Sequence, residues 1–84
     1  MVYILHISSL SPLTTKDHLQ QLLPYKSITS IKIMQRKGRS RCYGFIELMN
    51  GDEFVEIIEK FNGRRVNGKP LKIRKGRNSP LRID

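Results

Sequence analysis

Alternating apolar and polar positions predict four β-strands in this chain. The alternation runs through residues 30–35, 41–48 and 71–74, and residues 2–7 form a β-branched and aromatic run. Side chains two positions apart share one face of a strand, so each segment presents one face to a core and one away from it. A short basic turn at residues 35–40 joins the second and third strands, which should therefore pair as an antiparallel hairpin.

Apolar residues at helical spacing predict two helices between these strands. The first stripe consists of Leu19, Leu22 and Leu23, and the second of Phe54, Ile57, Ile58 and Phe61. The first helix should begin at Thr14 or Thr15, because Thr14 and Asp17 have the spacing of a capping box. It should end at Pro24, which has no amide hydrogen to donate.

The order strand, helix, strand, strand, helix, strand predicts an α+β fold, a ferredoxin-like βαββαβ sandwich. Two right-handed strand–helix–strand crossovers would give a four-stranded antiparallel sheet with both helices packed on one face. The second face of the sheet would then have no helix over it. The strand positions assigned to the core are Val2, Ile4, Ile31, Ile33, Ile46, Leu71 and Ile73.

Three aromatic rings alternate with these core positions. Tyr3, Tyr43 and Phe45 should therefore lie together on the uncovered face of the sheet. Rings left in water on a sheet face indicate a binding surface, and rings beside cations suit the stacking of nucleic-acid bases. The alternative, in which the strands are buried on both faces and the rings belong to the core, is disfavoured because the rings fall out of register with the core positions assigned to the strands.

Charge narrows the class of partner. The 84 residues include 16 Lys and Arg against 7 Asp and Glu, a formal net charge of +9 that attracts polyanions such as nucleic acid, an anionic membrane surface or an acidic protein. Most of the basic residues fall in two stretches, 32–41 and 64–82. The cations expected to contact phosphates are Lys32, Arg36, Lys37, Arg39, Arg41, Lys72, Arg74, Lys75 and Arg77.

Other functional classes find little support in the sequence. Cys42 is the single cysteine and has no metal-ligand companions, so neither a metal nor another cofactor is expected. The loop at residues 8–14 lacks the glycine and arginine of a phosphate-cradling catalytic loop, and no nucleophile and base are positioned for catalysis, so an enzyme is not expected. No apolar run is long enough to span a membrane.

The third predicted strand resembles a motif of the RNA-recognition motif family. The segment 41–48 is similar to that family's octamer, Lys/Arg-Gly-Phe/Tyr-Gly/Ala-Phe-Val-x-Phe/Tyr. Cys42 and Leu48 depart from the octamer, but both should point inward, where they affect packing more than binding. The matching positions are Arg41, Tyr43, Gly44 and Phe45.

The first predicted strand resembles the second motif of the same family, its hexamer. In residues 2–7, Tyr3 takes the aromatic position of the hexamer and His6 stands where asparagine is usual. The two motifs occur at the expected separation and in the expected order of elements, and the resemblance covers nearly all of residues 2–75.

The resemblance implies that single-stranded RNA crosses the sheet. Tyr3 and Tyr43 would each stack on a base, Phe45 would contact the sugars between two nucleotides or a further base, and Arg41 would reach a phosphate or a base edge. Residues 1–76 would form the RNA-binding domain, and residues 77–84 a basic tail or linker.

We therefore expect an RNA-binding domain that acts in RNA processing or regulation. The unpaired cysteine fits a reducing compartment inside the cell, the nucleus or the cytoplasm. The domain would be a monomer or one module of a longer protein. Two alternatives stay open: a protein-interaction module of the same fold, with docking through the helix face, and binding of single-stranded DNA.

Overall fold

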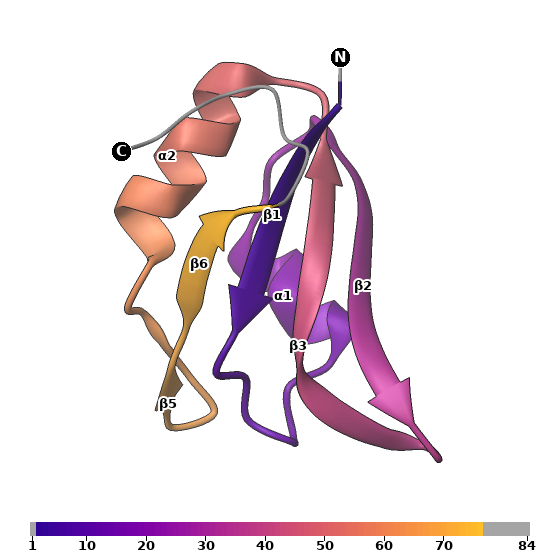
Figure 1. Cartoon of the computed structure of the whole chain (residues 1–84). Helices are drawn as coiled ribbons and strands as arrows, with labels where there is room; N and C mark the ends of the chain where they lie inside the picture. The colour runs from indigo at the N-terminus through magenta and orange to yellow at the C-terminus, as the bar shows by residue number, and fades with distance from the viewer. Residues whose placement is uncertain (1, 77–84) are drawn as a thin grey trace.

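The computed structural model describes residues 2–76, and the chain path follows the predicted order of strands and helices (Figure 1). The main elements are β1 (Tyr3–Ser8), α1 (Lys16–Leu22), β2 (Ile28–Arg36), β3 (Arg39–Leu48), α2 (Gly51–Phe61) and β6 (Lys72–Lys75). A small hairpin that the sequence did not predict as strands, β4 (Arg65–Val66) with β5 (Lys69–Pro70), precedes β6.

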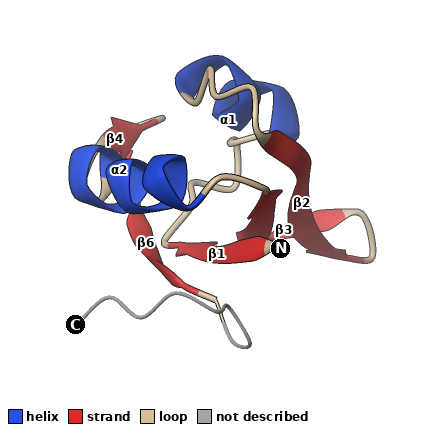
Figure 2. Cartoon of the chain, turned by 90° about the horizontal axis from the view of Figure 1, so that it is seen from above, coloured by secondary structure: helices blue, strands red, loops and turns tan. Residues whose placement is uncertain are grey.

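The four long strands form one antiparallel sheet in the order β2-β3-β1-β6. Both helices lie on the same side of this sheet, as Figure 2 shows from above. The predicted ferredoxin-like sandwich is therefore confirmed. We call the side of the sheet opposite the helices the open face.

The core fills the space between the sheet and the helices. Phe54 and Ile57 of α2 and Leu19 of α1 are fully buried against Ile46 and Leu48 of β3. Residues of the other strands, and Leu71 just before β6, complete the same cluster: Leu5, Ile7, Ile31, Leu71 and Ile73. The inward positions predicted for β2, β3 and the start of β6 agree with this cluster, with Ile33 packed at its margin.

The predicted facing of β1 is wrong. Leu5 and Ile7 are fully buried under the helices, whereas Val2 is 45% exposed and Ile4 lies on the open face. Residues 2–7 are apolar at almost every position, so alternation within the strand cannot reveal which face is inward. The pairing of Leu5 with Ile46 decides it, because residues directly opposite in a sheet share a face.

The capping box of α1 lies one residue later than predicted, and it selects Thr15 over Thr14 as the start of the helix. Thr15 caps the helix: its side chain accepts from the His18 backbone amide, and the Thr15 amide donates to Nδ1 of His18 at 3.1 Å. His18 thus takes the reciprocal role that the sequence assigned to Asp17. Thr14 is buried and its hydroxyl accepts from Asn67, which ties the β4–β5 turn to the start of α1.

Both hairpins close with two-residue turns. Lys37 and Gly38 have φ values of 53° and 77°, and Asn67 and Gly68 have 52° and 84°. Two successive positive φ values give the turn whose twist matches paired strands. The β2–β3 hairpin, predicted from the sequence, is confirmed, and the Lys37-Gly38 turn places its cations at the end of the sheet (Figure 1).

Candidate nucleic-acid interface

A row of four side chains crosses the open face from edge to edge. Phe45 of β3 pairs with Lys32 of β2 on one side and with His6 of β1 on the other, and His6 pairs with Arg74 of β6. Paired residues of an antiparallel sheet have Cβ atoms about 4.5–5.5 Å apart. The row therefore sets two half-buried rings between two exposed cations.

Three rings meet at the centre of the open face. The His6 ring lies 5.3 Å from Phe45 and 5.8 Å from Tyr43, centre to centre, and Tyr43 stands edge-on to Phe45 at 6.2 Å. All three are only partly buried, so their remaining surface faces outward. We call His6, Tyr43 and Phe45 the ring cluster. It offers π faces on which bases can stack.

Tyr3 does not join the ring cluster. It shares a face with Leu5 and Ile7, and its ring packs 5.4 Å from Phe54 of α2, at the margin of the core. Its hydroxyl lies beside Gly51, where α2 begins. The predicted place of Tyr3 beside the other two rings is therefore wrong, for the same reason that the facing of β1 is wrong.

His6 is the residue that sequence reasoning missed. By sequence, His6 stands at a position where the family usually has asparagine. The register of β1 instead pairs it with Phe45, so its ring lies at the centre of the open face. One signal in the sequence could have revealed this. Reading the hexamer three residues later, as residues 5–10, puts His6 at its aromatic position and keeps apolar residues at Leu5, Ile7 and Leu10, all of which are fully buried.

The predicted cations divide into three groups. Lys32, Lys72 and Arg74 lie on the open face, where Lys72 pairs with Ser8 and Arg74 with His6. Lys75 instead pairs with Leu5 and so lies on the helix side of the sheet edge, which contradicts its predicted place. The remaining predicted cations within the described residues are exposed near the hairpin end: Arg36, Lys37, Arg39 and Arg41. Arg77 lies outside the described residues.

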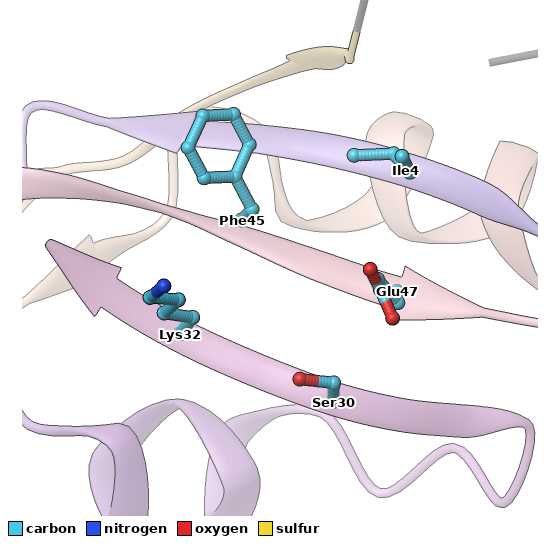
Figure 3. A pocket seen from close by; sticks show the side chains of 5 residues that line it. All are labelled: Ile4, Ser30, Lys32, Phe45 and Glu47. Carbon is cyan, nitrogen blue, oxygen red and sulfur yellow. The ribbon is translucent and has the colours of Figure 1, made fainter. Parts of the chain in front are cut away.

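A hollow of about 330 Å³ adjoins the Phe45 ring on the open face. Figure 3 shows its walls: Lys32 and Phe45 at one end, and Ile4, Ser30 and Glu47 at the other. Glu47 pairs with Ser30 on one side and with Ile4 on the other. It is the one carboxylate that the described strands present on this face, since the other described acids lie on α1 and α2.

Comparison with known proteins places this geometry in a family. A family model described as RNA recognition motif matches residues 5–72. The chain belongs to the RNA recognition motif family. The matched residues include His6, Tyr43 and Phe45, whereas Tyr3 precedes them.

Curated proteins resemble this chain over part of their length. Polyadenylate-binding protein 4 of Arabidopsis thaliana is 33% identical over 66 residues, which is 76% of this chain and 10% of that protein. This chain spans between 10% and 37% of the length of the first curated relatives it matches.

Two solved structures share the fold. The second such domain of yeast poly(U)-binding protein superposes with a TM-score of 0.81, at 22% identity, over 98% of both chains. The domain of RNA15 solved with bound RNA (GU) gives a TM-score of 0.79, at 22% identity, over 93% of this chain and 86% of that one.

Nothing in the described part of this RNA recognition motif domain forms a metal site, since residues 2–76 bring no three His, Cys, Asp or Glu side chains together. No helix in that range has the length and hydropathy needed to cross a bilayer.

Substitution of His6 should affect RNA binding, whereas substitution of Tyr3 should affect stability. His6→Ala should weaken RNA binding by about 1 kcal/mol, roughly fivefold, because a stacking ring is lost, and it should leave the melting temperature nearly unchanged. Tyr3→Ala should leave RNA affinity within about twofold, but lower stability by about 1–3 kcal/mol, because its ring packs against Phe54. Fluorescence anisotropy and thermal denaturation of both variants measure the two effects. His6→Phe, which keeps a ring, should bind like the wild type, and a larger binding loss in Tyr3→Ala than in His6→Ala would contradict the assignment.

Proposed function

We propose that the open face of this RNA recognition motif domain binds short single-stranded RNA, with a role in RNA processing or regulation. The observation that carries the proposal is the ring cluster at the centre of the face, flanked by Lys32 on one side and Arg74 on the other. The related domain solved with bound RNA supports it, because it shares the fold.

The ring cluster would supply the contacts to bases. Tyr43 and His6 would each stack on one base, and Phe45 beside them would contact a sugar or a further base. Each base–ring stack contributes about 1–3 kcal/mol and accepts any base. Single-stranded RNA is the form whose base faces are free to stack, since a duplex presents only edges, sugars and phosphates.

The cations would hold the phosphates along the same path. Lys32 and Arg74 lie at either end of the row of four side chains, and Lys72 continues along β6. Further cations, Arg36, Lys37, Arg39 and Arg41, are exposed on the β2–β3 hairpin, whose turn extends beyond the rest of the sheet (Figure 1). RNA that crosses the ring cluster would therefore meet a cation at each edge.

A titration of labelled RNA tests this proposal. A short single strand of mixed sequence should bind more tightly than the same sequence held in a duplex, and its affinity should fall with salt by a slope of about −0.7 for each phosphate neutralised. Arg74→Gln should make that slope less negative by about 0.7. Lys60→Gln is the matched control, because it removes one positive charge from α2, where Lys60 pairs with Glu56, away from the open face. Equal affinity for duplex and single strand would overturn the proposal.

Single-stranded DNA is the second candidate ligand, because stacking and phosphate contacts do not require a 2′-hydroxyl. A titration with the DNA version of the same sequence separates the two: RNA selectivity requires a clear preference for the ribose strand.

Protein binding through the helix face has weaker support. The acids of α2 are engaged in contacts within the domain: Glu53 accepts from the Ser27 hydroxyl at 2.9 Å, and Glu56 pairs with Lys60. Hydrogen bonding from Tyr25, and then from Lys60, lowers the pKa of Glu56. Burial, together with Glu56, raises the pKa of Tyr25 to about 12. These contacts within the domain engage two of the three glutamates of α2, Glu53 and Glu56, without a protein partner.

The proposed function also concerns organisation and location. The domain at residues 1–76 would act as a monomer or as one module of a longer protein, with residues 77–84 as a basic tail or linker; those last residues lie outside the described ones. Non-catalytic binding inside the cell, in the nucleus or the cytoplasm, fits the family and the single free Cys42.

A further inference from the structure

The hollow beside Phe45 has the features of a base-reading subsite. Its walls combine the Phe45 ring and Ile4, which are apolar, with three polar side chains, Ser30, Lys32 and Glu47. Polar groups that converge at one end of an apolar hollow fix the orientation of a ligand and select for its chemistry. This inference rests on the proposed function, because the base would arrive on an RNA strand that crosses the ring cluster.

Glu47 is poorly placed for phosphate binding. The carboxylate of Glu47 repels the phosphates of a polyanion that binds this face. Its presence there therefore favours a contact with a base over a contact with a phosphate. Within residues 2–76, no hydrogen bond or ion pair occupies its side chain, although its backbone carbonyl accepts from Thr29. An ionised carboxylate only accepts hydrogen bonds, so it selects for N–H groups.

The polar groups around Glu47 complement one edge of guanine. Guanine presents two adjacent donors, N1–H and the N2 amino group, which match the two oxygens of a carboxylate. Its neighbouring O6 is an acceptor, and Ser30 directly opposite Glu47, or Lys32 on the diagonal, can donate to it. We propose that this hollow is a guanine-selective subsite in which Glu47 reads N1–H and N2.

The other bases match less well. Cytosine and adenine each offer one exocyclic amino group to a carboxylate, whereas uracil sets its single N3–H between two carbonyl oxygens that a carboxylate repels. The expected order of affinity is therefore guanine first, cytosine and adenine next, and uracil last. The simpler alternative is that Glu47 is solvated and forms a transient ion pair with Lys32. That arrangement would give no preference among bases.

Four RNAs that differ at one position test the subsite. Each is a short oligouridine with guanine, cytosine, adenine or uracil at its centre, and a fifth carries inosine, which keeps N1–H and O6 but lacks the N2 amino group. Wild-type protein should bind the guanine strand about tenfold more tightly than the uridine strand. Replacement of guanine by inosine should remove a large part of that preference.

Glu47→Gln supplies the decisive comparison. It removes a negative charge, which should tighten binding of every strand, but the ratio of guanine to uridine affinity should fall to about threefold or less, and guanine and inosine should then bind alike. Glu47→Ala should behave in the same way, which separates hydrogen bonding by the glutamine from loss of the carboxylate.

An unchanged ratio in both variants, or no guanine preference in the wild type, would overturn the subsite while the open face still bound RNA. Failure of the wild type to bind any of the five strands would instead overturn the proposed function itself.

Discussion

The double substitution Tyr43→Ala/Phe45→Ala should reduce affinity for single-stranded RNA by about 2–4 kcal/mol, or roughly 30- to 1,000-fold in dissociation constant. Two of the three rings in the ring cluster disappear, and the His6 ring loses both of its neighbours, which lie 5.3 and 5.8 Å away. Cations remain at both ends of the row, so residual binding should be weak and strongly dependent on salt. Fluorescence anisotropy over a salt series measures both quantities.

Two controls make this result specific. The rings face away from the core, so the double variant should retain its circular dichroism spectrum and lose no more than about 1–2 kcal/mol of stability. The exchange Tyr43→Phe/Phe45→Tyr keeps both rings and should retain affinity within a few-fold. If the double alanine variant bound RNA as tightly as the wild type at every salt concentration, charge alone would hold the RNA and the ring cluster would need another ligand.

Gly44→Ala should lower the stability of the domain by about 2–3 kcal/mol, which corresponds to a fall of about 10–20 °C in melting temperature. A Cβ atom at Gly44 would lie 2.2 Å from the carbonyl oxygen of Lys32 and 3.1 Å from Cα of Ile33. Both atoms belong to the backbone of β2, so the strands must separate to make room. Thermal denaturation followed by circular dichroism measures the loss.

The same substitution should weaken RNA binding, because Gly44 lies between Tyr43 and Phe45 and packs against the strand that carries Lys32. Gly38→Asn is the matched control. A side chain at Gly38 meets nothing within 4 Å, and asparagine tolerates the positive φ of 77° there. If Gly44→Ala melted within about 3 °C of the wild type, the close approach of β2 and β3 would not be required by the fold.

Much of the architecture follows from the sequence alone. The polar and apolar positions of β2 and β3 alternate clearly, so Ile31, Ile46 and Leu48 could be assigned to the core and Tyr43 and Phe45 to the opposite face. Helical spacing identified the buried face of α2, and the basic turn at residues 35–40 indicated the β2–β3 hairpin, which closes at Lys37 and Gly38. These features depend on interactions between residues close together in the chain, which a sequence pattern records directly.

The composition of the ring cluster was decided only by the tertiary structure. β1 is apolar on both faces, so its own residues allow either orientation, and the choice depends on its register with β3 and β6, which are distant in sequence. That register places His6 rather than Tyr3 among the rings and Lys75 on the helix side. It also brings Ile4, Ser30 and Glu47 from three strands into one hollow. A sequence therefore predicts the faces of a strand that alternates, whereas the facing of a uniformly apolar strand is set by its partners in the sheet.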